Sequence, residues 1–113
     1  MSAITTHILD LSRGRPAQGV AVVLEVQAGE GWRVLGRGET NADGRQMSLL
    51  PDDFKLAAGV YRLNFSTSDY FTAQGVESFY PEVAISFIVK ETAAHYHVPL
   101  LVSPFGYSTY RGS

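Results

Sequence analysis

Short segments typical of β-strands, separated by turn-forming residues, follow one another along nearly the whole chain and restrict the fold more than any other feature. The segments cover residues 4–11, 20–26, 32–38, 60–65, 83–89, 95–102 and 107–110. Glycine, proline, asparagine and aspartate stand between them, and these residues favour tight turns. This pattern predicts an all-β fold, an antiparallel β-sandwich. Residues 67–74 are the only stretch that predicts a helix, and Gly75 suits its C-terminal end.

Apolar and polar side chains alternate most clearly in residues 60–65, where polar residues separate Tyr61, Leu63 and Phe65. A period of two places these three side chains on one face of a strand, toward the core. Residues 20–26 form a nearly continuous apolar run instead. Such a run predicts a strand that is buried on both faces.

Length and composition limit the classes of protein and partner. A chain of 113 residues buries roughly two thirds of its unfolded surface, so we expect one domain over residues 1–113. The absence of cysteine excludes disulfides and a thiol nucleophile. A net charge of −2 without runs of like charge does not favour nucleic-acid binding. The apolar runs are too short to span a membrane, and residues 1–7 do not resemble a signal peptide, so we expect a cytoplasmic protein.

Residues 95–113 hold more chemically active side chains than any other stretch. Two of the three histidines and three of the six tyrosines lie there, and the stretch ends in Tyr110-Arg111-Gly112-Ser113. Chain ends usually fray because they make few contacts. If residues 95–110 fold as a strand pair, this C-terminal tail belongs to the structure and is a candidate part of a site.

The histidines permit several roles. His95 and His97 are two residues apart, so on a strand they share one face. They are candidates for two metal ligands, two acid-base groups, or two solvent-facing polar residues. With His7 as a third ligand they would suit zinc with one open position, but nothing in the sequence brings His7 to the pair.

Other catalytic signatures are missing or ambiguous. The chain contains no G-x-S-x-G motif for a serine nucleophile and no glycine-rich phosphate-binding motif. Arg45 directly follows a strong turn signal at residues 41–44. A guanidinium there can contact a planar, carbonyl-rich ligand through two hydrogen bonds, but an ordinary surface arginine is the simpler interpretation.

Five segments together carry a family resemblance. They are Thr5-Thr6-His7-Ile8-Leu9-Asp10, Asn41-Ala42-Asp43-Gly44-Arg45, Phe79-Tyr80-Pro81-Glu82-Val83, His95-Tyr96-His97-Val98-Pro99-Leu100-Leu101 and Tyr110-Arg111-Gly112-Ser113. In these segments the chain resembles the 5-hydroxyisourate hydrolases, the transthyretin-related enzymes of purine degradation. The resemblance spans essentially the whole chain, and the Y-R-G-S end separates these hydrolases from transthyretin itself.

The resemblance implies a transthyretin-like antiparallel β-sandwich of two four-stranded sheets with one short helix. It also implies a homotetramer, a dimer of dimers, with active sites in a channel between the dimers. The implied reaction opens the six-membered ring of 5-hydroxyisourate with water and yields 2-oxo-4-hydroxy-4-carboxy-5-ureidoimidazoline. No metal and no organic cofactor are expected.

The resemblance also implies a set of site residues. The catalytic residues would be His7, Arg45, His97 and Ser113, and the substrate-binding residues would be Tyr110, Arg111 and Gly112. His97 would take a proton from water and His7 would place or polarise that water. Arg45 would stabilise the developing negative charge, and Ser113 would orient a histidine or the substrate. Two alternatives stay open: a transthyretin-like carrier of a small ligand, and a metal-dependent hydrolase that uses the histidines as ligands.

Overall fold

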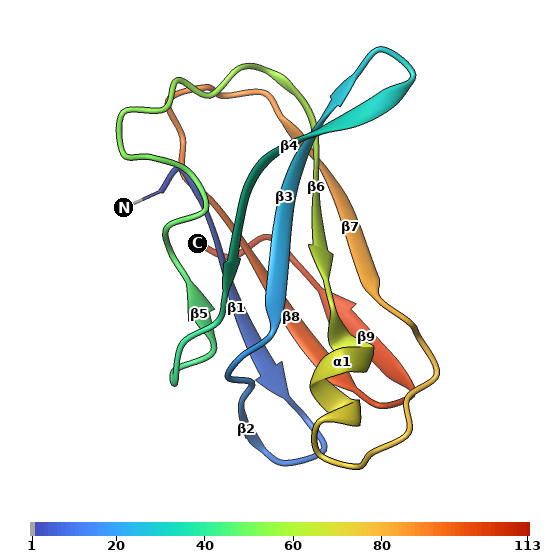
Figure 1. Cartoon of the computed structure of the whole chain (residues 1–113). Coiled ribbons are helices and arrows are strands. Elements are labelled where there is room, and N and C mark those ends of the chain that lie inside the picture. The colour runs from blue at the N-terminus through green and yellow to red at the C-terminus, as the bar shows by residue number, and fades with distance from the viewer. Residues whose placement is uncertain (1) are drawn as a thin grey trace.

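In the computed structural model, which describes residues 2–113, two β-sheets pack face to face and one short helix lies at one end (Figure 1). The first sheet contains β1 (Ile4–Asp10), β2 (Arg15–Pro16), β5 (Arg45–Gln46), β8 (Tyr96–Ser103) and β9 (Gly106–Thr109). The second sheet contains β3 (Ala21–Ala28), β4 (Gly31–Glu39), β6 (Gly59–Phe65) and β7 (Val83–Val89). Helix α1 (Thr67–Thr72) follows β6. Among residues 2–113, no helix has the length and apolar character needed to cross a membrane.

The predicted all-β, transthyretin-like sandwich of two sheets with one short helix is confirmed. The second sheet has four strands in the order β4-β3-β6-β7, as predicted. The first sheet has five, in the order β2-β1-β8-β9, because the two-residue strand β5 also pairs with β1. One pairing departs from the antiparallel prediction: β1 and β8 run parallel. They come from opposite ends of the chain and are not joined by a hairpin, so nothing forces them to run antiparallel.

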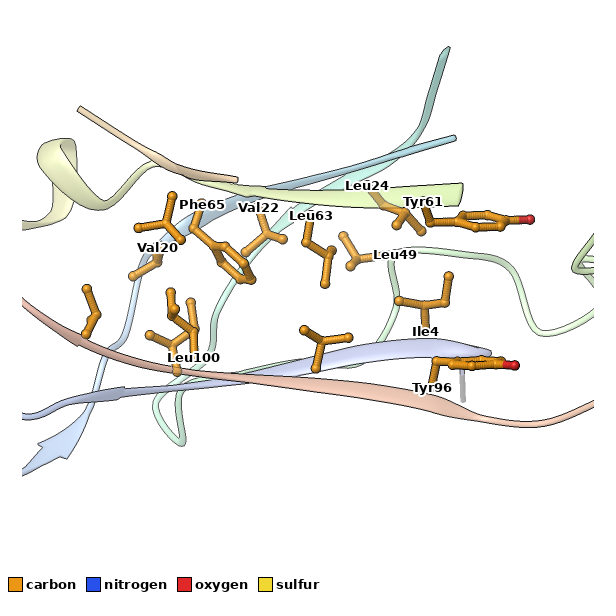
Figure 2. Packing of buried hydrophobic residues seen from close by; sticks show 14 of the residues in the cluster. Ile4, Val20, Val22, Leu24, Leu49, Tyr61, Leu63, Phe65, Tyr96 and Leu100 are labelled. Atoms are coloured by element: carbon orange, nitrogen blue, oxygen red, sulfur yellow. The ribbon is translucent and has the colours of Figure 1, made fainter. Parts of the chain in front are cut away.

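The core lies between the two sheets, where side chains from both inner faces meet (Figure 2). Tyr61, Leu63 and Phe65 point inward from β6, as their alternation predicts, and Leu63 is 0% exposed. The prediction that residues 20–26 are buried on both faces is wrong. Leu24 of β3 is buried, but the next residue, Glu25, lies on the outer face and accepts a 3.0 Å hydrogen bond from Arg62 Nε.

The turn at residues 41–44 determines where β5 lies. The Asn41 side chain accepts hydrogen bonds from the backbone N–H groups of Asp43 and Arg45, at 2.9 and 3.0 Å. Gly44 has a φ of 75°, which favours glycine, and a Cβ there would collide with the carbonyl oxygen of Ile8. The Gly44 carbonyl accepts a 2.7 Å bond from the Ile8 N–H. The turn therefore fixes Arg45 against β1.

Alternation along β1 and β8 gives the first sheet two different faces. Ile4 and Ile8 of β1, and Leu100 of β8, point into the core. The intervening residues, His7 of β1 and His97 of β8, therefore lie on the outer face of the same sheet. The predicted histidines thus lie on one surface, although the chain between them runs through the entire second sheet.

Candidate active site

His7 and Arg45 are neighbours because β1 and β5 pair with each other. The register of this pair sets His7 opposite Arg45, next to Thr6 opposite Gln46. His7 is half-buried, whereas Arg45 is exposed. The arrangement leaves the guanidinium group accessible to a ligand on the outer face and keeps the imidazole beside it.

His97 reaches the same surface through the parallel pairing of β1 and β8. In this register Thr5 lies opposite His97, and His7 lies opposite Pro99. His7 and His97 are therefore diagonal neighbours on the outer face of two adjacent strands. The two histidines and Arg45 come from three strands, and the structure brings all three together.

The C-terminal tail, residues 110–113, contacts His97 through Gly112. The Gly112 N–H donates a 2.8 Å hydrogen bond to the His97 carbonyl, which makes an isolated antiparallel bridge. A Cβ on Gly112 would lie 2.6 Å from Cδ2 of the His97 ring and 3.3 Å from Cγ of Pro99. Glycine is therefore needed here for close approach to the imidazole. Ser113 follows directly and is exposed.

Two of the predicted substrate-binding residues face another part of the surface. The Arg111 guanidinium stacks over the Tyr96 ring at 4.4 Å, and its Nη2 lies 3.5 Å from the His95 carbonyl oxygen. Tyr110, which is 60% exposed, lines a hollow with Arg111 and with Ile88 of the edge strand β7. Within one chain these two side chains thus line a hollow separate from the cluster of His7, Arg45 and His97.

Burial and nearby positive charge favour the neutral forms of both site histidines. Burial lowers the pKa of His7, and the charge of Arg45 lowers it further, against the opposing effect of the Asp43 carbonyl. Burial is also the main cause that lowers the pKa of His97, followed by the charge of Arg45 and those of the other two histidines. Both shifts favour the neutral imidazole, which is the form that can accept a proton.

One residue of this surface was not predicted from the sequence. Thr5 contacts both histidines of the H-x-H pair: its hydroxyl lies 3.0 Å from His95 Nε2 and 2.8 Å from His97 Nδ1. Besides its place in the segment Thr5–Asp10, its signal was its position two residues before His7, which places both on one face of β1. That spacing points to a contact with His97 only once the parallel register of β1 and β8 is known, and sequence patterns do not reveal this register.

The arrangement of the side chains does not favour a zinc site. Among residues 2–113, no three His, Cys, Asp or Glu side chains lie close enough together to hold a metal ion. The His97 ring instead contacts the Thr5 hydroxyl and lies close to Gly112. The cluster suits acid-base chemistry on a polar ligand that carries oxygen atoms for the Arg45 guanidinium.

Comparison of the sequence with known proteins gives matches over nearly the whole chain. The model of the HIUase/transthyretin family matches residues 4–112. The 5-hydroxyisourate hydrolase of Caulobacter vibrioides is 48% identical over 117 residues, with 100% of each chain covered. The 5-hydroxyisourate hydrolase of Salmonella typhimurium is 47% identical over 110 residues, which cover 97% of this chain and 80% of the relative.

Solved structures agree with these matches. The 5-hydroxyisourate hydrolase of Klebsiella pneumoniae superposes with a TM-score of 0.83 at 41% identity, covering 97% of this chain and 92% of the other. Transthyretin from Sparus aurata superposes with a TM-score of 0.90 at 33% identity, covering 99% and 97%. The backbone is thus shared with a hydrolase and with transthyretin, so the backbone alone does not distinguish the two activities.

Proposed function

The chain belongs to the HIUase/transthyretin family and is a 5-hydroxyisourate hydrolase, and we propose that the cluster of His7, Arg45 and His97 is where it opens the substrate ring. The product would be 2-oxo-4-hydroxy-4-carboxy-5-ureidoimidazoline, formed without a metal or organic cofactor. The observation that carries this proposal is the meeting of two imidazoles and one guanidinium on a single sheet face.

His97 acts as the general base in this mechanism. Its neutral imidazole takes a proton from water as the water oxygen bonds to a ring carbonyl carbon of the substrate. The same proton then passes to the ring nitrogen when the carbon–nitrogen bond breaks, which leaves a ureido group and a carboxylic acid. The acid ionises to a carboxylate by releasing the second proton of the water to the solvent. The lowered pKa of His97 supports this role, because a base must be unprotonated at the start of the reaction.

Arg45 and His7 stabilise the charge that develops during this step. Attack by water turns the carbonyl oxygen into an oxyanion, and the exposed Arg45 guanidinium can donate two hydrogen bonds to substrate oxygens. His7 lies beside Arg45 and places or polarises the attacking water. The two residues work as a unit because β5 pairs with β1 exactly where His7 lies, at a register fixed by the turn at residues 41–44.

The C-terminal tail completes the proposed site. Ser113, through its hydroxyl or its carboxylate, orients a histidine or the substrate, and Gly112 lets the tail approach the His97 ring closely. Tyr110 and Arg111 bind substrate in this proposal. Because they line a hollow at the open edge of one chain, they would reach a substrate held partly by another subunit.

This placement leads us to propose a homotetramer, a dimer of dimers, with sites in the channel between the dimers. Strands β7 and β9 lie at the ends of their sheets, and such edges offer unpaired backbone groups to a partner. Ile88 on β7 and Tyr107 on β9 are both exposed there. A cytoplasmic location stays a prediction, and the absence of cysteine is compatible with it.

The polar, cationic character of the cluster argues against the alternative of a transthyretin-like carrier. Mixing the purified protein with freshly generated 5-hydroxyisourate should speed the loss of substrate well beyond its spontaneous decay, as followed by absorbance. Dialysis against a chelator should leave the rate unchanged. A rate equal to that with heat-denatured protein would refute the hydrolase, and a chelator-sensitive rate restored by metal would refute the metal-free mechanism.

Replacing Arg45 with glutamine should raise the pKa of both His7 and His97, because a positive charge beside them is lost. The acidic limb of the kcat/KM profile should therefore move to higher pH, and kcat should fall about a hundredfold. NMR titration of the histidine ring signals measures the pKa values directly. Arg33→Gln on β4 of the second sheet is the matched control and should move neither value. An unchanged His97 pKa in R45Q would contradict the electrostatic role of Arg45.

A further inference from the structure

The Thr5 hydroxyl lies between two histidine rings. Its Oγ1 is 3.0 Å from His95 Nε2 and 2.8 Å from His97 Nδ1, and the Thr5 residue is 0% exposed. Bulk water therefore cannot replace either partner. The parallel register also sets Thr5 opposite His97, so the backbone of two strands holds this contact in place.

A single hydroxyl hydrogen couples the protonation of the two rings. Thr5 can donate to only one ring nitrogen and must accept a hydrogen from the other. In the first arrangement Thr5 donates to His95 Nε2 and accepts from a protonated His97 Nδ1, so neutral His97 has a bare Nε2. In the second arrangement His95 Nε2 donates to Thr5, which then donates to His97 Nδ1, so neutral His97 carries its hydrogen on Nε2.

We propose that Thr5 and His95 are positioning residues that hold neutral His97 in the first arrangement, with its hydrogen on Nδ1 and Nε2 free to accept a proton from water. This role rests on the proposed function of His97 as the general base. Only the first arrangement leaves Nε2 unprotonated, and Nδ1 already contacts Thr5 and is not available to water.

The first arrangement also survives the proton transfer. When Nε2 takes the proton, both ring nitrogens of His97 become donors, and Nδ1 continues to donate to Thr5 without any rotation of the hydroxyl. The second arrangement would need the hydroxyl to reverse, because His97 Nδ1 could no longer accept. The two hydrogen bonds that link His97, Thr5 and His95 therefore suit both the neutral and the protonated form of His97 in one fixed geometry.

His95 has a defined part in this arrangement: it accepts the Thr5 hydrogen. It lies just before β8 and is exposed, so its substitution should leave the core intact. Without that acceptor, the Thr5 hydroxyl is free to donate to His97 Nδ1 and would favour the second arrangement. A glutamine at position 95 retains a carbonyl oxygen that can accept the same hydrogen.

The test compares Thr5→Val, which removes the hydroxyl at nearly constant shape, with Thr5→Ser, which keeps it. Long-range ¹H–¹⁵N NMR of the substrate-free protein should show His97 protonated on Nδ1 in the wild type and in T5S, but not in T5V. We expect T5V to lower kcat about tenfold to a hundredfold with KM nearly unchanged, and T5S to restore most of it. Thr6→Val is the matched control, since the Thr6 hydroxyl donates instead to the Val98 carbonyl.

His95→Ala tests the same relay from its exposed end, should T5V fold poorly. H95A should shift the His97 hydrogen toward Nε2 and lower kcat, and His95→Gln should reverse both effects. Either of two results would refute the positioning role of Thr5 and His95 while leaving the proposed function intact: a wild-type His97 that carries its hydrogen on Nε2, or an unchanged kcat in both T5V and H95A. A wild-type protein without hydrolase activity would refute the proposed function and this role with it. Because the NMR measurement needs no substrate, it distinguishes a wrong positioning role from a wrong function.

Discussion

Replacing His97 with glutamine should lower kcat by about a hundredfold to ten-thousandfold, the range expected when a general base is removed. Glutamine fills similar space and keeps a hydrogen-bonding group near Thr5, but it cannot take a proton from water. Because the base acts only in the transition state, kcat and kcat/KM should fall by similar factors. Stopped-flow measurement of substrate loss in H97Q gives both parameters.

His95→Gln is the matched control for this experiment. It makes the same chemical change two residues away but retains the acceptor for Thr5, so its activity should stay close to that of the wild type. The melting temperatures of both variants should lie near that of the wild type, since neither histidine belongs to the hydrophobic core. If H97Q kept activity within threefold of the wild type, roughly 0.7 kcal/mol in barrier height, His97 would not be the base.

Removing residues 111–113 should lower kcat/KM about a thousandfold while the sandwich stays folded. The deletion takes away the hydrogen bond from Gly112 to the His97 carbonyl and the guanidinium of Arg111 over Tyr96. It also removes Ser113. A displacement of about 1 Å in a catalytic group can cost a hundredfold in rate, and loss of substrate contacts adds to that effect. Activity, melting temperature and mass by light scattering should be measured together.

Substitutions of single glycines locate the cause of that loss more sharply. Gly112→Ala keeps the whole tail but sets a methyl group 2.6 Å from Cδ2 of the His97 ring, so either the ring or the tail must shift. Gly106→Ala on β9 is its control, because the nearest atom to a Cβ there, Oγ of Ser103, is 3.8 Å away. We expect a large loss of activity in G112A and little change in G106A. Full activity in the protein that lacks residues 111–113 would show that the tail is not part of the site.

Local patterns in the sequence predicted those features of the fold that depend on neighbouring residues. Alternation in residues 60–65 identified Tyr61, Leu63 and Phe65 as core residues, because side chains on a strand change face at every step. The turn at residues 41–44 was evident from residue types that tolerate its backbone angles. The apolar run at residues 20–26 gave a wrong prediction, because a run rich in valine also occurs on a strand with only one face in the core.

The candidate site was less accessible to such reasoning, since it depends on which strands pair. Nothing in the sequence indicates that Thr5 lies opposite His97, which is 92 residues further along the chain. Residue chemistry alone favoured a surface position for Arg45, and Arg45 is indeed exposed. Its proposed role in the site depends on the strand register that sets it beside His7, which residue chemistry does not reveal. The roles of the site residues came from the family resemblance and remain proposals that the experiments above test.

The parallel pairing of β1 with β8 has a consequence for how the molecule is made. Contacts between segments far apart in the sequence form late, because closing a long loop costs entropy before any contact repays it. The central strand pair of the first sheet therefore forms only when β8 pairs with β1. The tail can contact His97 only after that pairing. In a refolding experiment, hydrolase activity should return in the slowest phase, after the fluorescence of Trp32, which lies on β4 of the second sheet under the Arg62 guanidinium, has recovered.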